Sequence, residues 1–442
     1  MRPLKSLTLE SVIGTLSATF QKIGDKRDPA KVKYALHDVL MSGFAMMFFH
    51  HPSLLQFQER MKQKRDRCNL ETIFQVKSVP SDTQMREILD EVSPESLRPL
   101  LPKLFESVRR AGWAEQYKTS VPSGKNKGSY YTMPLDGMEY FHSIEIQCPG
   151  CLKKEDSKSG RTDYYHYVVG ATLVKAGSHR ILPLDVEEVR NTDGQEKQDC
   201  ELNAGKRLIE RVRKEHPQLP LIVMGDDLYS HEPYVLLLIE KRMHFVLVAK
   251  PESHKELFEW VEDLDRQGEC LKGKWEEGTG SKRRFYEYRV IDIVPLKAGG
   301  RLGVNFVEVW ERDQNGKLLY HNSWVTDLDV DSENVAVIVR IGRSRWKIEN
   351  EQFNIHKNHG YEVEHNYGHG EKNLSMVFYL LNLMAFVTHL ILEFGDRLYQ
   401  KCRKQETLRE TWLILRTMMR TMLFENWNAM LLHFLNEEEA SP

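Results

Sequence analysis

The sequence predicts an α/β protein with a helical region at each end and a β-rich insertion in its central part. Three observations support this prediction. Residues 30–115 carry helical patterns, residues 130–250 alternate strand-like with helix-like segments, and residues 251–335 are polar and strand-like. At 442 residues, the chain is long enough for two or three domains with sizeable cores.

The N-terminal region, residues 1–118, is predicted to be a helical accessory domain. The segment ALHDVLMSGFAMMFF at 35–49 is apolar on most faces, and SDTQMREILDEV at 81–92 opens with the N-cap residue types Ser81 and Asp82. Residues 119–129, TSVPSGKNKGS, are rich in Gly, Ser and Lys. They are therefore predicted to be a linker.

The central region begins with three strand-like segments, YYTMPLDGMEYF, YYHYVVGATLVKA and HRILPLDVEEV. A helix-like segment ending before Pro217 follows, and then the apolar strand LPLIVMGDDLYS, the helix EPYVLLLIEKRM and the strand HFVLVAK. An antiparallel meander followed by parallel strands with crossover helices is the order of a ribonuclease H-like α/β domain. Residues 130–250 are predicted to form its first part and residues 336–395 its last part.

Between these two parts, residues 251–335 are predicted to be an inserted β-subdomain with hairpin turns at KAGGR and DQNGK. Residues 373–392 contain no Asp, Glu, Lys or Arg, and this segment is long enough to span a bilayer. Asn382 and His389 lie inside this segment, and no second segment of this kind exists, so a buried core helix is expected. Residues 396–442 are predicted to form C-terminal helices.

Composition sets outer limits on function. The net charge is −2, which predicts no particular partner, but residues 1–130 hold 21 Lys and Arg against 14 Asp and Glu. A basic N-terminal third is compatible with nucleic-acid binding. Six cysteines in a chain of this size do not suggest a disulfide scaffold, and the N-terminus lacks the apolar core of a signal peptide. A reducing, cytoplasmic setting is expected.

Three carboxylates fall at informative places. Asp136 follows the apolar run of the first strand, Asp226 ends the apolar strand LIVMG, and Glu349 lies in the segment that returns after the insertion. If the first and fourth strands are neighbours, Asp136 and Asp226 lie side by side and Glu349 can face both. A carboxylate cluster needs compensating cations, and hard divalent metals are its natural partners. A single strand-end aspartate usually only caps a turn, so the prediction depends on the three acids together.

The segment RSRWKIENEQFNIHKNHG, residues 343–360, is predicted to be one helix. On it, Arg345, Glu349, Phe353 and His356 share one stripe, at offsets of four, four and three residues. This stripe would present an acid between two cations, with Trp346 and Ile348 anchored in the core. The alternative is an exposed helix with Arg–Glu pairs, which leaves the tryptophan unexplained.

These residues resemble the DDE transposases of bacterial insertion sequences, in the branch whose final glutamate lies in a tyrosine–arginine–glutamate–lysine motif. The matching elements are LDG at Asp136, GDDLY at Asp226 and RWKIE ending at Glu349, with separations of 90 and 123 residues. The Asp-x-x-Tyr spacing selects Asp226 over Asp227. The resemblance covers roughly residues 80–390 and implies that DNA at the ends of a mobile element is cut and joined with two Mg²⁺ or Mn²⁺ ions.

The resemblance further implies double-stranded DNA as the partner, both as terminal inverted repeats and as target, and a homodimer on DNA in the bacterial cytoplasm. Two positions depart from the motif. Gly342 stands where the family has its tyrosine, and His356 stands where it has its lysine, with Lys357 next. The phosphate contact of that lysine is expected to pass to His356 or Lys357, beside a further contact by Arg345.

CPGC at 148–151 is a zinc-binding signal that needs further ligands. His142, His166 and Cys200 are the candidates, and the set Cys148, Cys151, His166 and Cys200 is predicted to hold one structural Zn²⁺. A surface turn with free thiols is the alternative. The His-rich stretch HGYEVEHNYGHG at 359–370 has no spacing of a closed metal site, and a DNA-facing loop with His365, Tyr367 and His369 is expected.

Electrostatic DNA binding is expected from RMKQKRDR at 60–67, SGKNKG at 123–128 and two clusters of the insertion, which contain Trp275, Lys282, Arg283 and Arg284. Trp275 and Phe285 could stack on a displaced base. Solvated loop charges are the alternative. An inactive, transposase-derived DNA-binding protein and a zinc-dependent hydrolase are the competing functions.

Overall fold

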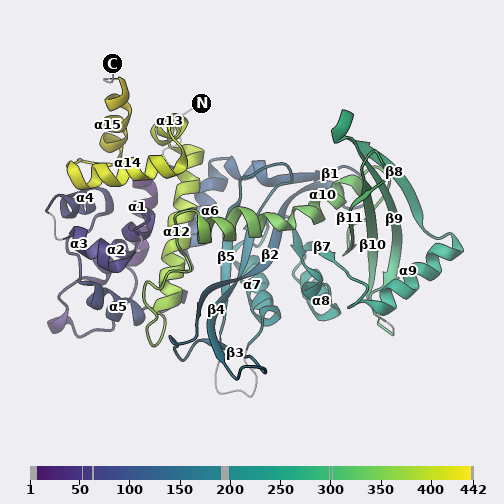
Figure 1. Cartoon of the computed structure of the whole chain (residues 1–442), viewed down its shortest axis with the longest axis horizontal. Coiled ribbons are helices and arrows are strands. Elements are labelled where there is room, and N and C mark those ends of the chain that lie inside the picture. Colours follow the sequence, from purple (N-terminus) through teal and green to yellow (C-terminus); the bar gives the residue numbers. More distant parts are fainter. Residues whose placement is uncertain are drawn as a thin grey trace.

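The computed structural model describes residues 7–51, 53–61, 64–190, 199–297, 299–300 and 302–439. Within this part of the chain, eleven strands form one mixed sheet, and helices gather mainly at one end of it (Figure 1). The protein is therefore mixed α/β, as predicted.

The N-terminal region is helical. Its helices are α1 (Leu9–Phe20), α2 (Leu36–Phe48), α3 (Leu54–Met61), α4 (Lys64–Phe74), α5 (Asp82–Asp90) and α6 (Leu100–Arg110). The predicted cap at Ser81 is confirmed, because its Oγ accepts a hydrogen bond from the Gln84 N–H at 3.3 Å. The apolar segment predicted around residues 35–49 is α2, of which nearly every residue is buried.

The predicted linker is wrong. Residues 119–129 instead belong to β1 (Lys118–Val121), the turn after it, and the start of β2 (Gly128–Ser143), and the two strands pair antiparallel. The turn is tied to a distant loop, because the Lys125 N–H donates to Asp329 Oδ2 at 2.9 Å and Ser123 Oγ donates to Asp331 at 2.8 Å. Gly, Ser and Lys therefore mark a tight turn here rather than a flexible connection.

The central sheet contains the strands and crossover helices that the sequence predicted, with β1 and β3 in addition. Its strands are β2, β3 (Leu152–Glu155), β4 (Thr162–Leu173), β5 (Leu182–Val189), β6 (Leu221–Gly225) and β7 (His244–Val248), with α7 (Glu201–Glu215) and α8 (Glu232–Glu240) between them. β5, β4 and β2 pair antiparallel, and β6 and β7 continue parallel to β2. The first and fourth strands of the predicted meander, β2 and β6, are therefore neighbours.

The insertion is β-rich but not purely so. The strands β8 (Leu271–Glu277), β9 (Arg284–Pro295), β10 (Gly303–Arg312) and β11 (Leu318–Thr326) form an antiparallel run, and the two predicted hairpins join β9 to β10 and β10 to β11. The prediction of strand-like structure is wrong for residues 255–267, which form the amphipathic helix α9 (Lys255–Gln267). Because β11 pairs with β7, the insertion extends the central sheet instead of standing apart from it.

The C-terminal helices join the N-terminal ones. α12 (Leu374–Gly395), α13 (Arg397–Gln405), α14 (Leu408–Thr421) and α15 (Trp427–Glu439) lie with α1–α5 in one helical body (Figure 1). Asn69 Nδ2 of α4 donates to the carbonyls of Met419 and Met422, each at 2.8 Å, and Phe48 packs edge-on against Trp412. The regions predicted as separate N- and C-terminal units thus share one core.

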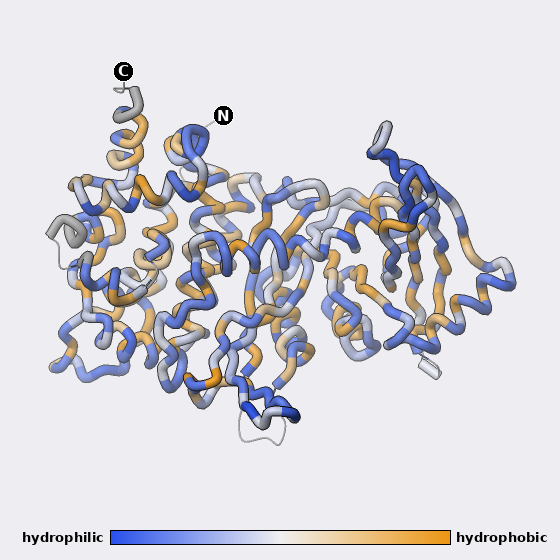
Figure 2. Tube along the Cα trace, in the orientation of Figure 1, coloured by the Kyte–Doolittle hydropathy of each residue, from blue (hydrophilic) through white to orange (hydrophobic). Residues whose placement is uncertain are grey.

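The segment predicted to be a buried helix is α12. By length and composition alone it could cross a membrane, yet 89% of its most apolar window is buried inside the protein. It packs against α2, α5, α6 and β5. In Figure 2, hydrophobic residues lie along the inner helices and the central strands, whereas the turn between β8 and β9 is hydrophilic. The core is continuous from the helical body into the sheet.

Candidate active site and a cysteine–histidine cluster

Asp136 and Asp226 lie just beyond the paired part of the neighbouring parallel strands β2 and β6, Asp136 in the middle of β2 and Asp226 directly after β6. The ladder between β2 and β6 runs to the pair Pro134–Met224, and both aspartates follow that pair by two residues. Paired residues of parallel strands share a face, and so do residues two apart. The register therefore places Asp136 and Asp226 on one face of the sheet, where the pairing of β2 with β6 ends.

One segment covers this face. It follows α10 (Val335–Arg343) and consists of a 3-10 turn (Ser344–Trp346), a π-helix (Glu349–Phe353) and α11 (Asn354–Asn358). We call residues 344–358 the covering segment; Figure 1 shows it as the light green helical ribbon that crosses the sheet. Ser344 Oγ contacts Met224 Sδ of β6 at 3.6 Å, and Gln352 accepts a hydrogen bond from Thr172 of β4. The segment thus spans β6, β2 and β4.

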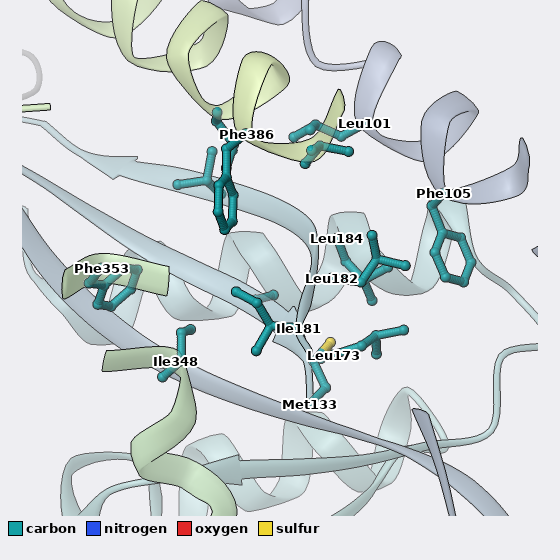
Figure 3. Packing of buried hydrophobic residues seen from close by; sticks show 14 of the residues in the cluster. Leu101, Phe105, Met133, Leu173, Ile181, Leu182, Leu184, Ile348, Phe353 and Phe386 are labelled. Carbon is teal, nitrogen blue, oxygen red and sulfur yellow. The ribbon is translucent and has the colours of Figure 1, made fainter. Parts of the chain in front are cut away.

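A glycine sets the depth at which the covering segment packs. Gly170 on β4 is the register partner of Asp136, and a Cβ built on it would meet the Phe353 ring at 3.3 Å and Ile348 at 3.5 Å. Figure 3 shows Ile348 and Phe353 in an apolar region that also contains Phe386 of α12. Both side chains are buried, at 0% and 4% exposure. Burial of Ile348 and Phe353 therefore holds the covering segment over Asp136.

Arg345 joins the covering segment to Asp136. Its Nη1 donates to Asp136 Oδ2 at 2.6 Å, and the two side chains are 25% and 21% exposed. Burial raises the pKa of Asp136 to about 6, and the negative charges of Asp226 and Glu201 add to the rise. Arg345 and the Gly137 N–H oppose it. Burial thus outweighs the stabilisation that Arg345 gives to the ionised carboxylate.

Glu201 is a fourth carboxylate that sequence reasoning missed. It lies in the first turn of α7, where it accepts hydrogen bonds from Tyr167 Oη and Tyr229 Oη, each at 2.8 Å. A Cβ on Gly137 would lie 1.9 Å from Tyr167 Oη, so the glycine after Asp136 leaves room for this tyrosine. Tyr229, the aromatic residue of the Asp-x-x-Tyr element, thus positions Glu201 through a hydrogen bond.

The two neighbouring aspartates after β6 have different surroundings. Asp226 Oδ1 accepts the Leu228 N–H at 3.0 Å and caps a short 3-10 turn (Asp227–Tyr229). Asp227 is tied to the loop after β7, where it accepts the Lys250 N–H at 2.7 Å and a hydrogen bond from Ser253. Both make the capping contacts of an ordinary turn, but only Asp226 lies beside Asp136.

Glu349 is exposed, at the start of the π-helix. Among the described residues, the only group of three or more Cys, His, Asp or Glu with ligand atoms all within 4.8 Å of one another does not include Asp136, Asp226 or Glu349. The donor set fits Mg²⁺ in chemistry, because all its ligand atoms are carboxylate oxygens. The Arg345 guanidinium now supplies a positive charge beside Asp136.

The predicted polar stripe is wrong in its second half. A π-helix adds one residue to a turn and so rotates the side chains after it by about 100°. His356 consequently points into the core at 0% exposure, between Tyr361 and Phe386, and its burial lowers its pKa to about 3. It is not available for the predicted phosphate contact. Trp346, expected in the core, is 43% exposed.

The two motif departures have physical causes in the packing. A Cβ on Gly342 would lie 2.5 Å from the indole Nε1 of Trp324, a fully buried residue on β11, so the indole fills the space that a tyrosine would need. Lys357, the other predicted phosphate contact, pairs with Glu364 at 2.6 Å. It remains partly exposed.

A comparison with known protein families finds a match in the N-terminal helical region. Residues 17–103 match the model of the DDE_Tnp_1-associated family. This match points to the DDE transposases. No curated protein sequence matches the chain. The matched part runs from the end of α1 to the start of α6, and it does not include Asp136, Asp226 or Glu349. It supports membership among transposases and the insertion-sequence association, without reaching the chemistry.

CPGC has a partner set different from the one predicted. Cys148, Cys151 and His166 lie together, but the fourth member of the cluster is His369. Cys200 is exposed at the start of α7, and His142 lies near Asp163 at 3.7 Å. The prediction of Cys200 as the fourth ligand is therefore wrong. His369 belongs to the stretch predicted as a DNA-facing loop, but this half-buried side chain faces Cys151, and Tyr367 of the same stretch is buried. The prediction is therefore wrong for both residues.

Two of the predicted DNA-binding cations of the insertion form ion pairs with acidic residues. Arg283 donates to Glu276, and Arg284 lies 3.6 Å from Glu311. Trp275 stacks on Tyr286, with ring centres 4.6 Å apart, which covers one of its faces. Lys282 is exposed. The side chains of residues 60–67 lie outside the described part of the structure.

Proposed function

We propose that this chain is a DNA transposase with a ribonuclease H-like core. In this proposal it cuts the ends of a mobile element and joins them to target DNA. The observation that carries the proposal is the adjacency of Asp136 and Asp226 on paired parallel strands, beneath the segment that carries Arg345 and Glu349. The strand order β5–β4–β2–β6–β7, with its parallel second half, supports the core assignment. The transposase-associated match at residues 17–103 is independent support.

Asp136, Asp226 and Glu349 would hold the Mg²⁺ or Mn²⁺ ions. When bound, such ions activate a water or a 3′-hydroxyl and stabilise the leaving oxygen. Burial raises the pKa of Asp136 to about 6, so above that pH its carboxylate is ionised and able to bind a cation. Once Asp136 has a metal partner, the Arg345 guanidinium is free to contact a DNA phosphate.

Substrate DNA would approach the open side of the covering segment. Glu349 and Trp346 are exposed there, and Lys347 lies over the Trp346 ring at 4.6 Å. An exposed tryptophan with a cation above it can stack on a base. The proposed partners are the element ends and target DNA, bound by a homodimer in the cytoplasm.

The test is a cleavage assay on duplex DNA that contains the sequences flanking the coding region, with Mg²⁺ or Mn²⁺. Asp136→Ala, Asp226→Ala and Glu349→Ala should each abolish strand cleavage and retain DNA binding in a gel-shift assay. Glu351→Ala is the matched control, because Glu351 lies on the same π-helix but bonds His179 at 3.0 Å, away from the acids. It should keep most of the cleavage. Cleavage by a variant lacking all three acids would refute the assignment.

One observation favours a second candidate, a transposase-derived protein that binds DNA without cutting it. Arg345 pairs with Asp136, Glu349 is exposed, and Asp136, Asp226 and Glu349 do not form one ligand cluster in this structure. The same assay separates the candidates. Specific binding to the flanking DNA, with no cleavage by the wild-type protein in either metal, would favour the inactive protein.

A further inference from the structure

The cluster of Cys148, Cys151, His166 and His369 has the dimensions of a tetrahedral zinc site. Zinc–sulfur and zinc–nitrogen bonds of about 2.3 and 2.0 Å separate two sulfurs by about 3.8 Å and a sulfur from a nitrogen by about 3.6 Å. The Cys148 and Cys151 Sγ atoms lie 3.8 Å apart, and His166 Nε2 lies 3.4 and 3.6 Å from them. His369 Nε2 lies 3.0 Å from Cys151 Sγ.

A disulfide or a set of hydrogen-bonded thiols fits these distances less well. A disulfide requires a sulfur–sulfur distance near 2.05 Å, and both cysteines are free. Hydrogen-bonded thiols could account for one or two of the contacts, but here four donor atoms from three separate parts of the chain all lie within 4.8 Å of one another. The CPGC turn is closed by the Cys151 N–H donating to the Cys148 carbonyl at 3.1 Å, which directs both sulfurs to one side.

The surroundings also suit a metal site. His166 presents Nε2 to the sulfurs, while its Nδ1 lies 3.4 Å from the carboxylate of Glu188. Glu188 is itself buried and pairs with Arg190. A carboxylate behind a ligating histidine fixes its orientation and raises its basicity. His369 packs against the Phe141 ring on β2, with centres 4.4 Å apart.

We propose that Cys148, Cys151, His166 and His369 bind one structural Zn²⁺. Four protein ligands leave no position for a water, so the site is structural rather than hydrolytic, and this argues against the zinc-dependent hydrolase. The metal ties the hairpin after β2 to the loop that links α11 to α12, 218 residues after Cys151. Asp90 holds the next residues of that loop through the N–H groups of residues 371–374.

The zinc site therefore fixes one end of the loop that leaves the covering segment. Its proposed role is to hold that loop on β2, a few residues beyond Asp136. This role is independent of whether the protein cuts DNA, because it concerns metal content and local structure. It can be tested on the protein without any DNA.

The first experiment measures metal in the wild-type protein after expression with added zinc. We expect equimolar zinc by elemental analysis, and an X-ray absorption spectrum that fits two sulfurs and two imidazole nitrogens. Cobalt exchanged into the site should give the intense visible bands of a tetrahedral centre with two thiolates. Absence of zinc, or a shell of oxygen and nitrogen only, would refute the proposal without any variant.

The second experiment identifies the fourth ligand. His369→Ala should lose most of the bound zinc, or bind it at least tenfold more weakly in a chelator competition. Cys200→Ser and His142→Ala are matched controls that should keep equimolar zinc. Circular dichroism would establish that His369→Ala is folded. Full zinc in His369→Ala together with loss in Cys200→Ser would restore the sequence-based set and overturn the geometry.

Discussion

The raised pKa of Asp136 should make the unfolding free energy of the protein depend on pH. The pKa of Asp136 rises from 3.8 to about 6 because of burial and the nearby Asp226 and Glu201. A difference of about 2 between the folded and unfolded pKa corresponds to roughly 3 kcal/mol of unfolding free energy. Asp136→Asn removes the ionisation and keeps an oxygen for the Gly137 N–H, which now donates to Oδ1 at 2.9 Å.

The sign follows from the direction of the shift. A raised folded pKa means that the folded state binds the proton more tightly, so this contribution to stability is complete below the unfolded pKa and is lost as pH rises through the folded pKa. The unfolding free energy of the wild-type protein should therefore fall relative to Asp136→Asn between about pH 4 and 6. The stability difference is the unfolding free energy of Asp136→Asn minus that of the wild-type protein. Without metal, this difference should be larger at pH 7.5 than at pH 4, by up to about 3 kcal/mol.

Urea unfolding at pH 4 and 7.5 measures this difference, with Asp292→Asn as an exposed-aspartate control that should show little change. Adding Mg²⁺ at pH 7.5 should stabilise the wild-type protein by about 2.7 kcal/mol at a hundred times its dissociation constant, and the variant much less. Equal stability differences at the two pH values would refute a raised pKa of Asp136 in the folded protein. An equal response to Mg²⁺ would refute the placement of metal at Asp136.

The remaining predictions test the packing and the DNA path. His356→Lys restores the residue type of the family, but it should destabilise the protein by more than about 3 kcal/mol because the ammonium would be fully buried. His356→Phe should cost less than about 1.5 kcal/mol, and thermal unfolding compares the two variants. Gly342→Ala should destabilise by about 1–3 kcal/mol through its clash with Trp324, whereas Gly14→Ala, in an open helical position, should be neutral or stabilising in the same measurement. Charge reversal of residues 282–284 should reduce the slope of log affinity for DNA against log salt concentration by about one unit rather than three, because two of the three cations already pair with acids. An unchanged slope would mean that DNA does not contact this part of the insertion.

The local pattern of the sequence determined the strand order, the β-rich character of the insertion, the buried helix α12 and the adjacency of Asp136 and Asp226. Each depends on information that lies within a few residues: alternation, apolar runs, and an acid directly after a buried strand. The parallel pairing of β2 and β6 then follows from the crossover connection between them. The glycines of LDG and GDDLY also belong to this local information, although only the structure shows that they make room for Tyr167 and Tyr229.

Tertiary structure alone decided the features that join distant residues or change helical phase. No periodicity marks the π-helix at Glu349–Phe353, because it forms where Ile348 and Phe353 both pack on Gly170, and its extra residue turns His356 into the core. Glu201 approaches the acids because two tyrosines from different elements hold it there. His369 completes the cysteine cluster in place of Cys200 because α12 folds back against the sheet and brings its preceding loop to β2. These contacts depend on side-chain packing between distant segments, which a one-dimensional pattern does not contain.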